Sequence, residues 1–264
     1  MKTSDTANPF PKSEDWLPLL LCGLELLVDP YPARILESFE AWNFRNKLRP
    51  QLRQLERSKF LERRGPRDNP TLHLTPRGHL AALGGIDPRQ RWRRSWDGKW
   101  RLIVFDLPLR ARAARMRLWR WLRDQRFGLL QRSVWLSPDT VDAKDLPFHQ
   151  FKIIPEAFCV MEGRPAVPDS DVDLVNSAWD FPEINRKYKA VLDLAAQGRE
   201  LFSSPGAEPL KLRQWLASDR LAWLEALESD PLLPEALLPP GYLGREAFQQ
   251  RQSSYESMAK QQKR

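Results

Sequence analysis

The apolar and polar positions of residues 96–138 form three segments with different periods. Residues 102–105 are an unbroken apolar run that ends at an Asp-x-Pro sequence, which predicts a buried strand with an abrupt end. Residues 127–138 end at Ser-Pro and predict a second strand. The segment between them, residues 110–126, lacks glycine and proline and is rich in arginine, leucine and alanine, which predicts a helix. Its apolar stripe consists of Ala111, Ala114, Leu118, Trp121 and Leu122.

The N-terminal third has the apolar spacing of three helices followed by a hairpin. Pro50 falls in the third helix, and because proline is tolerated in the first turn, we place that helix at about residues 50–59. A Pro-Arg-Gly sequence at 76–78 is predicted to end the hairpin. This order predicts a winged helix-turn-helix over residues 14–83. The predicted elements are helices at 14–28, 33–42 and 50–59 and strands at 60–64 and 71–75.

A winged helix places its third helix in the major groove of duplex DNA and its hairpin along the backbone or the minor groove. Arginine pairs with guanine and glutamine with adenine, so Gln51 and Gln54 are candidates for sequence specificity. Alternatively, the module binds protein, and the leucines of the helix serve only its core. The candidate DNA-binding residues are Arg45, Lys47, Arg49, Gln51, Arg53, Gln54, Arg57, Arg64, Arg67 and His73.

The positive charge of the chain is concentrated in one region. The net charge is +8, yet residues 41–101 carry 16 basic and 5 acidic groups, and residues 110–132 carry 8 basic groups and 1 acidic group. The remaining segments are net acidic. This distribution favours a polyanion as the partner over arginines that merely decorate solvated faces. Arg112, Arg120 and Arg123 fall on one side of the apolar stripe, where they either contact phosphate or form a solvated flank.

The rest of the chain predicts a linker, a third strand and a helical part. Residues 84–100 form the linker, in which three tryptophans recur every four positions and either stack on bases or, as we favour, anchor one domain on the next. The third strand is predicted at 157–163. The acidic C-terminal part predicts a helical domain over residues 174–262 for a ligand or a second subunit. Its predicted segments are helices at 174–202, 210–229 and 245–260 and a proline-rich connector at 231–240.

The sequence predicts a cytoplasmic protein without a cofactor, a metal ion or a membrane segment. No apolar run approaches the roughly 18–20 residues that span a bilayer. The N-terminus lacks the basic and apolar regions of a secretory signal. Cys22 and Cys159 are expected to be reduced core residues. The three histidines do not combine with them at a zinc-binding spacing.

Four segments spread over nearly the whole chain resemble the PaaX family, repressors of phenylacetic-acid catabolism and their relatives. They are LRQLERSKFLER with LHLTPRG, WDGKWRLIVFDLP with FGLLQRSVWLSP, AWDFPEINRKYKAVL, and DPLLPEALLPPGYLG. The resemblance implies an α+β protein with an N-terminal winged helix, a central ferredoxin-like α/β domain over residues 96–164 and a helical C-terminal domain. It also implies a homodimer that binds a palindromic operator in double-stranded DNA and is released by an acyl-CoA or aryl-CoA thioester. Gln54 stands where the family usually has arginine.

The central segment also resembles the CRISPR spacer-acquisition subunit with a ferredoxin-like fold, through VFDLP and LLQRSVWL. In nuclease versions of that fold an aspartate at the end of the first strand binds a divalent metal, and Asp106 occupies that position. A single carboxylate is a poor magnesium site unless a dimer supplies a second one. We therefore expect a DNA-binding regulator without enzymatic activity and keep two alternatives, a metal-dependent nuclease centred on Asp106 and a non-catalytic scaffold that binds protein.

Overall fold

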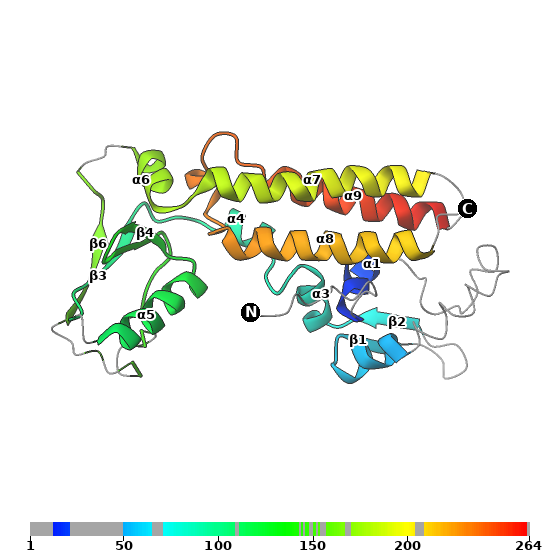
Figure 1. The fold of residues 1–264 in the computed structure, drawn as a ribbon, viewed down its shortest axis with the longest axis horizontal. Coiled ribbons are helices and arrows are strands. Elements are labelled where there is room, and N and C mark those ends of the chain that lie inside the picture. The colour runs from blue at the N-terminus through cyan, green and yellow to red at the C-terminus, as the bar shows by residue number, and fades with distance from the viewer. Residues whose placement is uncertain are drawn as a thin grey trace, which may run out of the picture. The chain divides into compact units, whose positions relative to one another are not determined.

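Figure 1 shows the chain as a computed structural model that divides into two compact units. One unit combines residues 1–87, 186–228 and 243–264, and the other combines residues 88–185 and 229–242. The structure describes residues 13–21, 50–64, 71–108, 111–142, 144, 146–147, 150–151, 153, 157–166, 170–203 and 209–262. The helix predicted at 33–42 and the second half of the one predicted at 14–28, residues 22–28, lie outside these residues.

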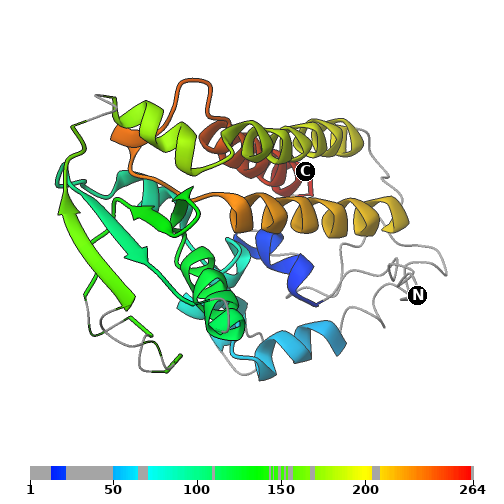
Figure 2. The same ribbon diagram turned by 60° about the vertical axis from the view of Figure 1, so that its left-hand side comes forward.

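The second unit is built on a four-stranded antiparallel sheet with helix α5 on one face (Figures 1 and 2). Its spatial order is β4-β5-β3-β6, so the first strand in the chain lies between the third and the fourth. This is the order of a ferredoxin-like sheet. The strands predicted at 102–105 and 157–163 are confirmed. The four strands are β3 Trp100–Phe105, β4 Gly128–Gln131, β5 Val134–Ser137 and β6 Phe158–Gly163.

Helix α5, Arg112–Asp124, buries the predicted apolar stripe against this sheet. Leu118 and Leu122 are fully buried and share a core cluster with Ile103 of β3 and Trp135 of β5. The prediction of a single strand at 127–138 was wrong. β4 and β5 form a hairpin instead, because the polar residues between them turn the chain back along the sheet.

The predicted linker at 84–100 contains a helix, α4 Pro88–Arg93. The buried indole of Trp92 donates a hydrogen bond to the hydroxyl of Tyr242 at 3.1 Å. The buried indole of Trp100 donates one to Oδ1 of Asp171 at 2.7 Å, at the start of α6 Asp171–Ala178. All four residues lie inside one compact unit, so the two tryptophans anchor this segment within that unit. The alternative interpretation, in which these two tryptophans stack on bases, is wrong because both rings are buried.

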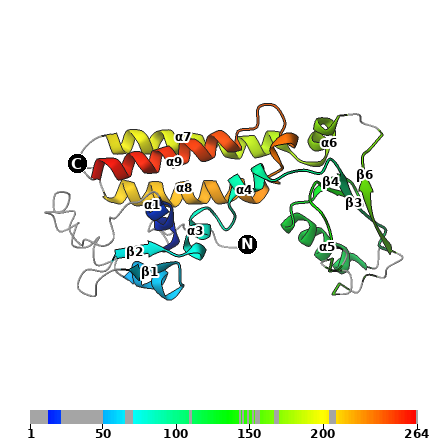
Figure 3. The same cartoon turned by 180° about the vertical axis from the view of Figure 1, so that it is seen from behind.

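The first unit contains most of three long helices, which lie side by side (Figure 3). They are α7 Phe181–Ser203, α8 Pro209–Ser229 and α9 Gly244–Gln262, and they confirm a helical C-terminal part. The helix predicted at 174–202 is broken into α6 and α7. Trp179 has an extended backbone, and the side chain of Asp180 accepts a hydrogen bond from the backbone N–H of Glu183 at 3.0 Å, which caps the start of α7.

The same unit contains a small N-terminal module with its own core of leucines. Leu17, Leu55 and Leu61 are buried there and come from three different elements. The hairpin strands lie where the sequence predicts them, in antiparallel register. The elements of the module are η1 Ser13–Trp16, α1 Leu17–Leu21, a helix at 50–57, β1 Leu61–Arg64, β2 Thr71–Leu74 and α3 Pro76–Ala82.

Helix α3 begins where the sequence predicts only the end of the hairpin, so that prediction was incomplete. The hydroxyl of Thr75 accepts a hydrogen bond from the backbone N–H of Gly78 at 3.0 Å, and Pro76 occupies the first helical position. The same hydroxyl donates to the carbonyl oxygen of Lys59 at 2.7 Å. Thr75 therefore starts α3 and also ties it to the turn that precedes β1.

Helix α8 holds this N-terminal module through two buried side chains. Arg220 donates to Oε2 of Glu14 at 2.9 Å and to the carbonyl oxygen of Ala81 at 3.3 Å. The indole of Trp223 donates to the carbonyl oxygen of Leu83 at 2.8 Å. Residues predicted for the first and third domains therefore belong to one compact unit.

Candidate nucleic-acid interface

The helix at 50–57 has one buried face and one exposed face. Leu55 is buried and Leu52 packs against the same core, whereas Arg53, Gln54 and Arg57 are exposed. At about 100° per residue, the three exposed side chains lie opposite the two leucines. Neither Arg53 nor Arg57 forms an ion pair within the described part of the chain. Two cations and one glutamine are therefore presented together to solvent.

Gln51 lies at the edge of this face. Its Oε1 atom accepts a hydrogen bond from the indole of Trp16 at 2.5 Å, and its side chain is half-buried. The amide of Gln51 therefore joins the helix to η1, whereas Gln54 has an exposed side chain. Of the two glutamines predicted to set specificity, Gln54 is the one that the structure leaves accessible.

The hairpin carries two further cations on its exposed surface. Arg63 donates through Nε to Oε1 of Glu56 at 2.5 Å, and this hydrogen bond, together with the charge of Glu56, raises the pKa of Arg63. Arg64 forms an ion pair with Glu62 on its own strand. Sequence reasoning missed Arg63, whose contact links β1 to the helix at 50–57. The sequence feature that could have revealed this contact is Glu56, one of the few acidic residues in a basic segment.

Of the other residues predicted to bind DNA, the structure describes only His73. His73 is exposed on β2, opposite Glu62 in the strand register. Arg77, which was not predicted, lies with its guanidinium 5.0 Å from the centre of the Phe60 ring on the exposed start of α3. Arg45, Lys47, Arg49 and Arg67 lie outside the described residues.

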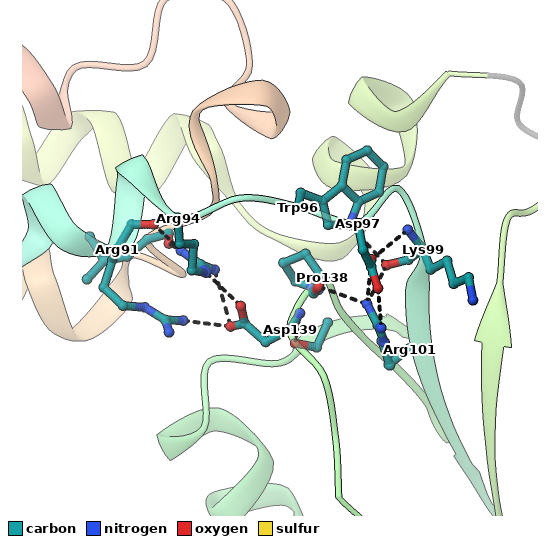
Figure 4. Close-up of polar contacts among 10 residues, drawn as sticks. Arg91, Arg94, Trp96, Asp97, Lys99, Arg101, Pro138 and Asp139 are labelled. Atoms are coloured by element: carbon teal, nitrogen blue, oxygen red, sulfur yellow. Dashed lines mark hydrogen bonds and ion pairs between the residues drawn. The ribbon is translucent and has the colours of Figure 1, made fainter.

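A separate group of charged residues joins the start of β3 to the end of β5 (Figure 4). The buried guanidinium of Arg101 donates to Oδ2 of Asp97 at 2.5 Å and to the carbonyl oxygen of Pro138 at 3.2 Å. The hydrogen bond from Arg101 lowers the pKa of Asp97 to about 2. Asp139 accepts hydrogen bonds from Arg91 and Arg94, at 2.6 Å each. The WDGKW and Ser-Pro segments thus hold the start of β3 against the end of β5.

Acid should weaken this group of contacts. Burial alone would raise the pKa of Asp139, but the hydrogen bond from Arg94 and the charges of Arg91 and Arg94 outweigh it and hold that pKa below its ordinary value. A carboxylate with a lowered pKa stabilises the fold above its unfolded pKa, and the contribution is lost as the pH falls through the folded pKa. We expect Asp139→Asn to lower the free energy of unfolding by about 1–2 kcal/mol at pH 7.

Urea unfolding at pH 7, 5 and 3 measures this effect. The wild-type protein should lose more stability below about pH 4 than the variant does. Asp124→Asn is the matched control, because Asp124 is exposed and forms no ion pair among the residues that the structure describes. Parallel stability curves for the wild-type protein and the Asp139 variant would contradict the assignment.

The remaining sequence expectations concern Asp106, metal binding, Cys159 and membrane-spanning helices. Asp106 is exposed just after β3, and its backbone N–H donates to the carbonyl oxygen of Ala157 at 2.9 Å. Within the described ranges, no group of three or more His, Cys, Asp or Glu residues is placed to hold a metal ion. Cys159 is exposed, so its prediction as a core residue was wrong. None of the helices in those ranges is long and apolar enough to cross a bilayer.

The fold defines a mixed α+β protein with a ferredoxin-like central domain and a helical C-terminal part. A family model described as the PaaX protein central Cas2-like domain matches residues 93–175, and one described as the PaaX-like protein C-terminal domain matches residues 179–264. The chain belongs to the PaaX family. This membership points to a transcriptional regulator of phenylacetic acid catabolism.

One solved structure supports the fold. It is the uncharacterized protein Rv0674 from Mycobacterium tuberculosis, which matches 94% of this chain and 98% of its own chain with a TM-score of 0.50. The two sequences are 20% identical, so the likeness concerns the fold alone. No curated protein matches the chain.

Proposed function

We propose that this protein is a transcriptional repressor that binds double-stranded DNA through the N-terminal module. The observation that carries the proposal is the exposed face of the helix at 50–57, where Arg53, Gln54 and Arg57 lie opposite the buried leucines. A helix with this division, followed by a two-stranded hairpin, is the arrangement of a winged helix that docks in a major groove. The family membership supports the regulatory role.

The side chains of this face have different chemistry and therefore different roles. Arg53 and Arg57 neutralise phosphates or pair with guanine, and Gln54 pairs with adenine through its amide. Arg64 and His73 contact the backbone from the hairpin. We assign the same backbone role to four residues outside the described ranges, Arg45, Lys47, Arg49 and Arg67.

Regulation is the second part of the proposal. We propose a homodimer, so that two modules bind half-sites about one helical turn, roughly 34 Å, or a multiple of it apart. An acyl-CoA or aryl-CoA thioester bound to the C-terminal helices would release the DNA. The contacts of Arg220 and Trp223 support this coupling, because they join α8 to the N-terminal module inside one compact unit.

Selection of genomic fragments by the purified protein tests the function. Gln54→Ala should change the selected sequence and lower discrimination at one base pair by about 1–3 kcal/mol, which is roughly 5- to 150-fold. Arg53→Gln should weaken binding to all sequences and reduce its salt dependence. Lys189→Gln is the control, because it removes an exposed positive charge from α7 of the same unit.

Three results would overturn the proposal. The first is a wild-type protein that binds duplex DNA without any salt dependence or sequence preference. The second is a Gln54→Ala variant that selects the wild-type sequence. The third is magnesium-dependent cleavage of nucleic acid that Asp106→Asn abolishes. Repeating the selection with a series of acyl-CoA thioesters identifies the effector, which should reduce the recovered DNA.

A further inference from the structure

The exposed side of α5 is a cationic surface in the ferredoxin-like domain. Arg112, Arg117, Arg120 and Arg123 are exposed there, and Asp124 is the only acidic residue of the helix. Figure 2 shows α5 on one face of the sheet. The apolar side chains Leu118 and Leu122 of α5 belong to the core cluster. We call the surface formed by Arg112, Arg120 and Arg123 the α5 face.

The arginines of the α5 face are not used to hold the fold. Other arginines nearby are: Arg115 donates to the carbonyl oxygen of Leu107, and Arg126 donates to that of Asp230. By contrast, no residue of the α5 face has an ion-pair partner in the part of the chain that the structure describes. Three guanidinium groups on one helix therefore remain available for an external anion.

Two features of the charge on α5 oppose the stability of the helix, although Arg123 in its last turn suits the helix dipole. The first turn contains no acidic residue and begins with Arg112, although the helix dipole favours negative charge at that end. Arg120 and Arg123 are three residues apart, so like charges are neighbours on the helix surface. Each feature is mildly unfavourable at an exposed site. A cationic face with this cost is better explained by a bound polyanion than by solvation.

We propose that the α5 face binds the phosphate backbone of duplex DNA, as a contact separate from the N-terminal module. At about 1.5 Å of rise per residue, Arg112 and Arg123 are about 16 Å apart along the helix axis. Duplex DNA carries one charge per strand for about every 3.4 Å of its axis, so each of the three arginines can meet a different phosphate. The proposal rests on the proposed function, since it takes the DNA of that function as the anion.

The chemistry of the α5 face favours duplex DNA over other polyanions. Proteins that bind single strands stack bases on exposed aromatic rings, and the aromatic residues of α5, Trp119 and Trp121, pack against the core. Helices that bind anionic membranes bury a broad apolar face, and α5 exposes only one large apolar side chain, that of Met116. A row of exposed arginines on one helix, without either feature, fits the phosphates of a duplex.

The test compares two triple variants of the full chain. The first replaces Arg112, Arg120 and Arg123 by glutamine, and the second replaces Arg93, Lys144 and Lys189, which are exposed cations on other segments. Both lose the same charge. Binding to the selected sequence, extended by random sequence on both sides, is measured between about 50 and 200 mM salt.

The α5 variant should lower the slope of log K against log salt by about three, one for each phosphate contact, and weaken binding on the order of 100-fold at 0.15 M salt. It should select the same sequence as the wild-type protein, and its melting temperature should not fall. The scattered variant should change the slope by less than one third of that amount. These results together would support the proposal.

Two outcomes would overturn it, and they differ from the failure of the proposed function. If the wild-type protein binds its selected duplex but both triple variants behave alike, the α5 face does not contact DNA, and the proposed function stands. If the wild-type protein binds single-stranded RNA or anionic vesicles more tightly than duplex, and the α5 variant alone loses that binding, the anion is not duplex DNA. Absence of any duplex binding by the wild-type protein would contradict both proposals.

Discussion

Replacement of Gly78 by alanine is expected to destabilise the N-terminal module by about 3 kcal/mol or more and to abolish DNA binding. An added Cβ atom would lie 1.9 Å from the carbonyl oxygen of Phe60. That oxygen belongs to the backbone and is held in place by the N–H of Thr75 at 3.0 Å. Because no side-chain rotation relieves the overlap, either α3 or the turn before β1 must move.

Thermal unfolding and duplex binding measure the two consequences. A loss of about 3 kcal/mol corresponds to roughly a 150-fold change in the folding equilibrium constant. Binding should fall with the folded fraction of the module if the module is the DNA-binding part. Gly163→Ala is the matched control, because its added Cβ atom meets no atom within 4 Å. If Gly78→Ala melted with the wild-type protein, the close packing of α3 on the Phe60 turn would be incorrect.

The elements that the sequence predicted well have strong local patterns. Leu118 and Leu122 lie on the stripe of α5 that the spacing indicated, and Leu52 and Leu55 lie on the inner side of the helix at 50–57. In each case the period of the apolar residues alone determines which side is buried. The exposed face with Arg53 and Gln54 follows from the same period.

The elements that the sequence missed depend on short-range hydrogen bonds or on partners far along the chain. Helix α3 is only seven residues long and depends on the cap by Thr75. The helix α4 anchors Trp92 on Tyr242, 150 positions away. The contact of Arg220 with Glu14 spans 206 positions. No window of sequence contains both partners of the last two contacts, so periodicity does not reveal them.

The charge of the sequence also overstates the number of available cations. Arg91, Arg94 and Arg101 belong to the segment with the largest excess of positive charge, yet all three are paired with Asp97 or Asp139. Arg63 and Arg64 are paired with glutamates on the hairpin and its neighbour. The charge count therefore indicated the correct region, but only the structure separates the arginines that hold the fold from those that face solvent.

Replacement of Arg251 by methionine is expected to lower the free energy of unfolding by about 3–5 kcal/mol, because it leaves a buried carboxylate without its cation. Asp219 on α8 is fully buried, and Arg251 on α9 donates to both of its oxygens, with Nη2 at 2.6 Å from Oδ2. The guanidinium also lies 5.1 Å from the centre of the Trp223 ring. The hydroxyl of Tyr255 supplies a third donor to the same carboxylate at 2.5 Å.

Urea unfolding of a double-mutant cycle separates the ion pair from its surroundings. Asp219→Leu combined with Arg251→Met should be more stable than Arg251→Met alone, because the double variant removes the unpaired charge and keeps the apolar packing. Tyr255→Phe is the graded control and should cost about 1–2 kcal/mol, since it deletes one hydrogen bond and leaves the ion pair intact. Additive losses in the double variant would show that Asp219 and Arg251 do not interact. Coupled losses would show that α8 depends on α9 for its position, and α8 is the helix whose Arg220 holds the N-terminal module.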